Sequence, residues 1–151
     1  GLINVGGEPY VIEYNCRMGD PETEVVMPRL KTDIVELFAA MDEEKLNEIE
    51  VEIDSRAAST VVLVSGGYPG DFEKGKQING LDTPVSADTI VFYAGITGTE
   101  GDLRTNGGRV AAITSYGKDI NEAVEKSLDA IKSIGYERMD FRKDIGFEFR
   151  N

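Results

Sequence analysis

One stretch near the start of the chain decides its interpretation, namely Val11-Ile12-Glu13-Tyr14-Asn15-Cys16-Arg17-Met18-Gly19-Asp20-Pro21-Glu22-Thr23-Glu24. Its first half alternates in character, so we expect a β-strand over residues 10–16. Successive side chains of a strand point to opposite faces, which would place Glu13, Asn15 and Arg17 together on one face. Three polar side chains on one face can converge on a single ligand.

The chemistry of these three side chains suits a metal-bound phosphate. Glu13 and Asn15 are oxygen donors of the kind that Mg²⁺ prefers, and Mg²⁺ usually takes one or two carboxylates together with phosphate oxygens. Arg17 adds a planar cation that suits phosphate or carboxylate. The same alternation is also typical of the solvated face of a half-buried sheet. The spacing alone leaves both interpretations open.

The residues after this strand predict a turn and then a helix. Gly19-Asp20-Pro21 is expected to turn, because glycine tolerates unusual dihedral angles and proline disfavours a helical backbone in the residue before it. Glu22 and Glu24 follow in the first turn of a helix, where acidic side chains are favoured. Cys16 lies on the strand face opposite to that of Arg17, so we expect it to be a small core residue.

Composition narrows the class of protein. A chain of 151 residues predicts one domain, or one domain with a fragment of another. The net charge of −12 argues against a nucleic-acid partner or an anionic membrane, because both require clustered Lys and Arg. The chain has no histidine, which excludes a His-based triad or His-ligated zinc within it. A single cysteine cannot form an intrachain disulfide, so a reducing, cytoplasmic location is expected, and no long apolar run suggests a membrane span.

The N-terminal third predicts a hairpin and two helices. Strands over residues 2–5 and 10–16 flank the hairpin signal Gly6-Gly7-Glu8-Pro9. A helix from about Glu22 should kink or end at Pro28. Asp33 and Glu36 resemble the cap pair of a second helix, and its apolar stripe is expected to be buried: Ile34, Leu37, Phe38 and Met41.

The middle of the chain turns from helical to β-rich. Residues 42–48 predict an exposed helical connector, and Val51 and Ile53 an edge strand. The apolar run 57–64 predicts a central strand. The glycine-rich segment that follows, residues 65–71, has two possible roles. It can present backbone N–H groups to a phosphate, or it can form an ordinary tight loop. Short strands are expected at 77–81, 89–94 and 95–98.

The last third contains a second candidate for ligand binding and the clearest helix. Gly107 and Gly108 precede Arg109, which begins a strand over residues 110–114 and can contact a ligand or pair with one of the many acids. Residues 119–134 predict a helix that packs across the sheet, with Val124 on its buried stripe and Gly135 as its cap. A short strand at 138–141 and an exposed, charged end at 142–146 complete the chain.

Four strings in order carry a family resemblance. Glu13-x-Asn15-x-Arg17 resembles the metal-holding strand of ATP-grasp ligases, and the longer string over residues 13–23 is similar to the phosphoribosylamine–glycine ligases, also called glycinamide ribonucleotide synthetases. Three later strings resemble the C-terminal region of the same family: Gly66-Gly67-Tyr68-Pro69-Gly70-Asp71, Thr105-Asn106-Gly107-Gly108-Arg109-Val110 and Phe141-Arg142-Lys143-Asp144-Ile145-Gly146.

The resemblance implies a two-part α+β fold. Residues 1–48 would be the terminal strands and helices of an ATP-grasp domain. Residues 49–151 would form the C-terminal domain of the ligase, a mainly antiparallel sheet with one principal packing helix. The N-terminal domain and most of the ATP-grasp domain would lie elsewhere in a longer chain, and this part alone is expected to be inactive.

The resemblance also implies an activity and roles for residues. The family joins glycine to 5-phosphoribosylamine with ATP, through glycyl phosphate, and gives glycinamide ribonucleotide in de novo purine biosynthesis. Glu13 and Asn15 would hold Mg²⁺ or Mn²⁺ beside ATP, and Arg17 would be the catalytic residue at the transferring phosphoryl group. The expected substrate-binding residues are Asp20, Glu22, Gly107, Gly108 and Arg109. For Asp20 and Glu22 the alternative is that they orient Arg17.

Two alternatives remain beside this interpretation. Another ATP-grasp ligase or carboxylase would share Glu13-x-Asn15-x-Arg17, but not the Gly-Asp-Pro-Glu continuation or the Asn-Gly-Gly-Arg string. A non-catalytic interaction or oligomerisation module would bind neither metal nor phosphate at Glu13 and would expose an apolar patch to a partner.

Overall fold

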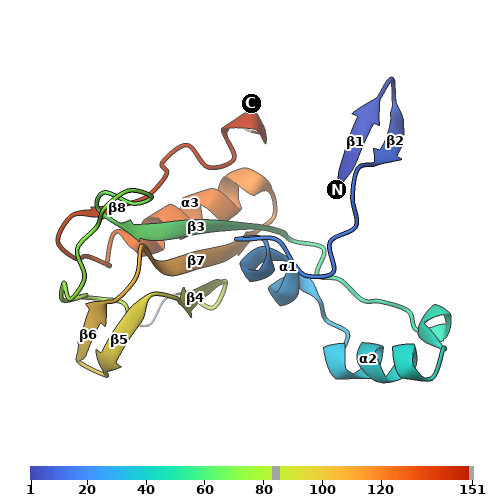
Figure 1. The fold of residues 1–151 in the computed structure, drawn as a ribbon, viewed down its shortest axis with the longest axis horizontal. Helices are drawn as coiled ribbons and strands as arrows, with labels where there is room; N and C mark the ends of the chain where they lie inside the picture. Colours follow the sequence, from blue (N-terminus) through green and yellow to red (C-terminus); the bar gives the residue numbers. More distant parts are fainter. Residues whose placement is uncertain (83–85, 150–151) are drawn as a thin grey trace.

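A four-stranded antiparallel sheet forms the centre of the computed structural model, which describes residues 1–82 and 86–149 (Figure 1). Its strand order is β4 (Thr89–Tyr93), β7 (Arg109–Gly117), β3 (Ala57–Ser65) and β8 (Met139–Asp140). β3 and β7 are the long central pair, as their apolar character requires, and β4 and β8 lie at the edges.

One face of the sheet is covered by helix α3 (Ile120–Ile131). Asp119 caps this helix by accepting a 2.9 Å hydrogen bond from the Glu122 N–H, and the buried stripe of α3 packs on β3 and β7. The resulting core contains Val61, Leu63, Ile113 and Ile131, and Val124 on the same helix is fully buried. The predicted α+β fold, with an antiparallel sheet and one principal packing helix, is confirmed.

The opposite face of the sheet carries the short helix α1 (Thr23–Arg29). The Thr114 hydroxyl donates a 3.0 Å hydrogen bond to the Glu24 carbonyl, and the Tyr116 hydroxyl donates a 2.5 Å bond to the Pro28 carbonyl. Pro28 lies in the last turn and α1 ends one residue later, as predicted.

Beyond β4 the chain forms a hairpin from β5 (Ile96–Thr99) and β6 (Asp102–Thr105). The strand that we predicted at residues 77–81 is reduced to two isolated bridges, Gln77 with Arg104 and Asn79 with Gly135. The chain closes with the 3₁₀ turn η2 (Phe147–Phe149), after Arg142 pairs with Asp144 on the surface.

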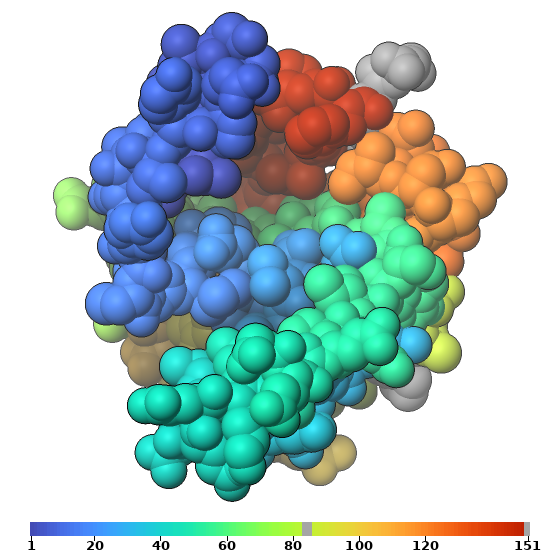
Figure 2. Space-filling view, turned by 90° about the vertical axis from the view of Figure 1, so that its right-hand side faces the viewer, coloured from blue at the N-terminus to red at the C-terminus, as the bar shows by residue number. Residues whose placement is uncertain are grey.

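Two N-terminal parts extend from this body, the hairpin β1 (Leu2–Val5)–β2 (Glu8–Val11) and the segment α2 (Ile34–Asp42)–η1 (Leu46–Glu48) (Figure 1). Seen from the side, the hairpin (dark blue) lies at the upper left of the near face and the α2–η1 segment (teal) along its lower part (Figure 2). The apolar stripe of α2 was predicted to be buried, and this prediction is wrong. Its members Phe38 and Met41 are 60% and 58% exposed in the described part of the chain. The predicted edge strand at Val51 and Ile53 is also wrong, since the pairing there is one isolated bridge from Ile53 to Leu30.

The strand expected over residues 10–16 ends early. In the hairpin, Leu2 pairs with Val11. Beyond this pair, the Gly1 carbonyl accepts a 2.8 Å bond from the Ile12 N–H, and the Gly1 ammonium group donates the last bond, to the Glu13 carbonyl at 2.7 Å. β2 ends at Val11, and the described residues offer no partner strand to the backbone after Glu13. Cys16 is consequently exposed, and our prediction that it is a core residue is wrong. No helix of the described segments is long and apolar enough to cross a membrane.

Candidate functional site

Glu13 and Asn15 lie side by side although no strand holds them. The Asn15 side-chain amide donates a 3.2 Å hydrogen bond to Glu13 Oε1. The Arg17 guanidinium donates to the Met18 carbonyl at 3.2 Å, and among the described residues it has no hydrogen bond to Glu13 or Asn15. All three side chains are exposed. The structure therefore brings the two oxygen donors together, through a loop rather than through a shared strand face.

The donor set fits a hard divalent cation in part. A carboxylate and an amide oxygen are suitable ligands for Mg²⁺ or Mn²⁺, although in this structure the Asn15 amide turns its NH2 group toward Glu13. Across residues 1–82 and 86–149, no three His, Cys, Asp or Glu side chains converge as a metal site would require. The described chain thus offers two ligands at Glu13 and Asn15, and further ligands would come from phosphate, water or another part of the protein.

Glu22 stabilises the turn that follows. Its Oε1 accepts a 2.7 Å hydrogen bond from the Gly19 N–H, and the Thr23 hydroxyl donates to the Gly19 carbonyl at 3.3 Å. These bonds close the turn before α1. The Glu22 carboxylate is therefore directed at its own backbone and not at Arg17.

Asp20 and Arg109, 89 positions apart in the sequence, form an ion pair between Asp20 Oδ1 and Arg109 Nη1. The hydrogen bond from Arg109 lowers the pKa of the Asp20 carboxyl below its usual range. The same bond raises the pKa of the Arg109 guanidinium, and Glu24 lies close enough to add to this rise. The sequence left open whether Arg109 contacts a ligand or an acid, and the structure shows the acid.

A β-bulge in β7 directs Arg109 to this partner. Leu63 pairs with Ala111, but Val64 pairs with Arg109, so Val110 is an extra residue in the ladder. In a regular strand Arg109 would share the α3 face with Ala111 and Ile113, whose side chains belong to the core. The bulge reverses its side and turns Arg109 toward α1 and Asp20.

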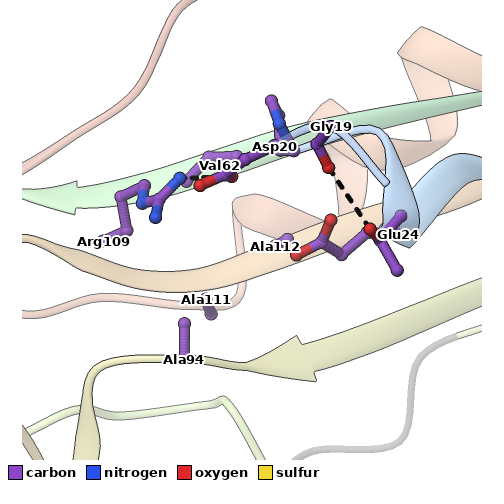
Figure 3. A pocket seen from close by; sticks show the side chains of 10 residues that line it. Gly19, Asp20, Glu24, Val62, Ala94, Arg109, Ala111 and Ala112 are labelled. Carbon is purple, nitrogen blue, oxygen red and sulfur yellow. Dashed lines mark hydrogen bonds and ion pairs between the residues drawn. The ribbon is translucent and has the colours of Figure 1, made fainter. Parts of the chain in front are cut away.

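A small cavity of about 200 Å³ lies beside this ion pair (Figure 3). Asp20, Glu24 and Arg109 are its charged side chains, and its remaining walls are backbone or small residues: Gly19, Pro21, Thr23, Val62, Ala94, Ala111 and Ala112. Figure 3 shows Glu24 reaching over Ala112 from the α1 side, with Arg109 on the opposite side. Sequence analysis did not predict this cavity, because the cavity depends on the bulge and on the packing of α1 against a distant strand.

Gly107 and Gly108 lie behind Arg109 in a tightly packed loop. Their carbonyls accept 2.8 Å bonds from the Ser65 hydroxyl and the Ser65 N–H, respectively. A Cβ at Gly108 would lie 2.2 Å from a ring carbon of Tyr68. These glycines therefore serve close packing against the loop over residues 65–71, which favours the tight-loop interpretation of that segment.

Comparisons with known proteins agree on one family. The family model described as Phosphoribosylglycinamide synthetase, C domain, matches residues 58–148. A phosphoribosylamine–glycine ligase of Vibrio cholerae is 48% identical over 147 residues, which cover 97% of this chain and 34% of that protein. The crystal structure of a phosphoribosylamine–glycine ligase from Thermotoga maritima matches with a TM-score of 0.68 at 34% identity, over 95% of this chain and 35% of that one.

A more distant likeness concerns the fold alone. The crystal structure of the Kluyveromyces lactis urea carboxylase matches 89% of this chain and 12% of that one, with a TM-score of 0.53 at 20% identity. The chain thus spans about a third of the curated relatives that it matches, 34% of their length in each of the first three.

Proposed function

The chain belongs to the phosphoribosylglycinamide synthetase family, and we propose that it is the C-terminal part of an ATP-dependent ligase that joins glycine to 5-phosphoribosylamine. The observation that carries this proposal is similarity to such ligases along 97% of the chain, from the N-terminal hairpin to the charged end. The product would be glycinamide ribonucleotide, formed through glycyl phosphate in purine biosynthesis.

In this proposal Glu13 and Asn15 hold Mg²⁺ or Mn²⁺ beside ATP. Their adjacency, with a 3.2 Å contact between the two side chains, supports the assignment. A bound cation would supply charge neutralisation to the phosphate oxygens. Arg17, exposed and free of an acidic partner within the described residues, would bind the transferring phosphoryl group through its planar donors.

The substrates would lie near the turn at Asp20. Asp20 and Arg109 line the cavity and are assigned to substrate contact. Glu22, Gly107 and Gly108 belong to the same proposed site, and their hydrogen bonds support a role in shaping the turn and the loop around it.

The rest of the ligase would cover the extended N-terminal parts. Large apolar side chains are exposed there, including Val35 at 68% and Phe38 at 60%, and such surface is typical of an interface. We assign residues 1–48 to the end of an ATP-grasp domain and residues 49–151 to the C-terminal domain. The cleft for ATP would require the domains outside this sequence, so the isolated chain is expected to be inactive. A cytoplasmic location belongs to the same proposal.

The test uses the full-length protein that contains this sequence. ADP release that depends on both glycine and 5-phosphoribosylamine is expected for the wild type. Glu13→Gln and Arg17→Ala should each lose about 2–4 kcal/mol of transition-state stabilisation in kcat/KM. Glu125→Gln, an exposed carboxylate on α3, and Arg142→Ala serve as matched controls and should keep wild-type rates.

Two results would change this conclusion. Wild-type rates in both site variants would leave the Glu13 loop with a scaffolding role. A folded wild type without glycine-dependent ADP release would direct attention to other ATP-grasp ligases and carboxylases, or to an interaction module.

A further inference from the structure

Two backbone carbonyls of α1 lack a donor within the helix. A helical N–H bonds to the carbonyl four residues earlier, and Pro28 has no N–H, so the Glu24 carbonyl loses its usual partner. The Pro28 carbonyl lies in the last turn of α1, where carbonyls have no intrahelical donor. Because α1 packs against the sheet, these carbonyls require other partners.

Two hydroxyls of β7 satisfy these carbonyls. Thr114 donates to the Glu24 carbonyl at 3.0 Å, and Tyr116 donates to the Pro28 carbonyl at 2.5 Å. The two spacings match, because two residues along a strand and four residues along a helix each cover roughly 6–7 Å. Thr114 is fully buried and Tyr116 is 7% exposed, so water competes little for either bond.

A second group of residues fixes the Tyr116 side chain. The Arg56 guanidinium lies 4.2 Å from the centre of the Tyr116 ring, which is an attractive cation–π contact. Arg56 Nη2 is 2.7 Å from Asp54 Oδ2, and its Nη1 is 2.8 Å from Asp88 Oδ1. Arg29, the last residue of α1, donates two hydrogen bonds to the Asp54 carbonyl, at 2.9 and 3.2 Å. The end of α1 is therefore held by Tyr116 and by the segment that carries Arg56.

The other end of α1 carries the turn that follows Arg17. Glu22 accepts the Gly19 N–H at 2.7 Å, and the Thr23 hydroxyl donates to the Gly19 carbonyl at 3.3 Å. The turn and the start of α1 thus form one hydrogen-bonded unit. The hairpin β1–β2 is a sheet of its own and, among the described strands, does not pair with the central sheet (Figure 1). α1 is consequently the main attachment of the loop over residues 13–17 to that sheet.

The ion pair between Asp20 and Arg109 is a second attachment, and a weaker one. The two side chains are 57% and 42% exposed. Ion pairs at the surface are screened by water and contribute little to stability. The hydroxyl bonds of Thr114 and Tyr116 are shielded from water, so they mainly determine where α1 lies on the sheet.

We propose that Thr114 and Tyr116 are positioning residues, which hold α1 and thereby set the position of Arg17 relative to the C-terminal sheet. This inference rests on the proposed ligase function. Phosphoryl transfer depends strongly on the placement of the groups around the phosphate, and a displacement of about 1 Å can lower a rate about a hundredfold. Both residues act through α1, so neither requires contact with a substrate.

The first experiment tests the attachment of α1 without an activity assay. Amide hydrogen exchange of α1 is measured by mass spectrometry in the full-length protein. Tyr116→Phe should speed this exchange about five- to tenfold, because one shielded hydrogen bond is lost. Tyr136→Phe is the matched control, since its hydroxyl donates to the Val64 carbonyl at 2.9 Å and not to α1, and it should leave α1 exchange unchanged. Wild-type exchange in a folded Tyr116→Phe protein would overturn the proposal.

The second experiment tests the positioning role. Tyr116→Phe and Thr114→Val should each lower the kcat of ADP release about tenfold or more, with the KM for glycine and for ATP within twofold of wild type. Thr114→Ser keeps the hydroxyl and should restore the wild-type kcat. Tyr136→Phe loses the same kind of bond elsewhere and should keep its kcat. An unchanged kcat in Thr114→Val and Tyr116→Phe, or an equal loss in Tyr136→Phe, would refute the positioning role.

The two proposals can fail separately. Ligase activity in the wild type with an unchanged kcat in the Thr114 and Tyr116 variants would leave the ligase function standing and remove the positioning role. Absence of ligase activity in the wild type, together with faster α1 exchange in Tyr116→Phe alone, would remove the function and keep the attachment of α1.

Discussion

Replacing Val124 by Asp tests whether α3 anchors the domain. Val124 has no solvent-exposed surface, on the stripe of α3 that packs against β3 and β7. Loss of the buried valine side chain removes about 1.5–3 kcal/mol of hydrophobic stabilisation. A buried carboxyl must also stay protonated, and raising its pKa from about 3.9 to beyond 7 costs about 4 kcal/mol at pH 7.

The combined loss of about 6 kcal/mol is a large part of the roughly 5–15 kcal/mol by which a domain of this kind is stable. At about 2–4 °C per kcal/mol, the melting temperature should fall by roughly 10 °C or more. Urea and thermal unfolding of the 151-residue chain, followed by circular dichroism, measures this. Val35→Asp makes the same change at a side chain that is 68% exposed, and should alter stability by about 0.5 kcal/mol or less.

The penalty at Val124→Asp should also depend on pH. The folded state raises the pKa of the new carboxyl, so the penalty is absent below the ordinary Asp pKa and grows as the pH rises toward the folded value. Lowering the pH from 7 to 5 should therefore recover about 3 kcal/mol relative to the parent. A Val124→Asp protein that melts within two degrees of the parent at pH 7 would refute the core assignment of α3.

Two further predictions follow from contacts that the sequence did not show. Arg109→Gln should raise the pKa of Asp20 back toward its ordinary value, because the guanidinium of Arg109 lowers that pKa in the parent. In the parent, the ion pair is intact at any pH above the ordinary Asp pKa and is lost as the pH falls through the lowered pKa of Asp20. A ¹³C carboxyl titration measures both midpoints, and identical midpoints would contradict the pairing. Gly80→Ala should destabilise the chain by more than about 1 kcal/mol, because the new Cβ would lie 1.9 Å from the Ser133 carbonyl oxygen at a φ of +77°. Gly75→Ala, with a φ of +80° and no atom within 4 Å, is its control, and equal losses in urea unfolding would show that the contact with Ser133 is unimportant.

Sequence patterns correctly predicted the helices and strands that pack against other parts of this chain. β3, β7 and α3 have long patterns that match their burial, and they pack mainly on one another, so periodicity and packing agree. The same reasoning failed for α2 and for the strand through Glu13. Both have a regular pattern, but the described residues give neither of them a second surface or partner strand, so Phe38 and Cys16 are exposed.

The candidate site shows a different limit of sequence reasoning. The spacing of Glu13, Asn15 and Arg17 suggested a shared strand face, whereas the structure joins the first two by a side-chain hydrogen bond in a loop. The residue types thus indicated oxygen ligands for a metal, but the prediction that Glu13 and Asn15 lie on a β-strand was wrong. Glu24 was visible only as a helix-start acid, since its place in the cavity depends on Val62 and Ala112 from distant strands.

One face of β7 connects the two halves of the proposed site. Arg109, Thr114 and Tyr116 all reach the N-terminal segment, through Asp20, the Glu24 carbonyl and the Pro28 carbonyl. Thr114 and Tyr116 hold α1 by regular alternation, and Arg109 joins them on that face only because the bulge at Val110 reverses its side. A substitution that removed the bulge would therefore return Arg109 to the α3 face and release Asp20, while Thr114 and Tyr116 would keep α1 in place. The bulge thus links the C-terminal sheet to the turn that follows Arg17.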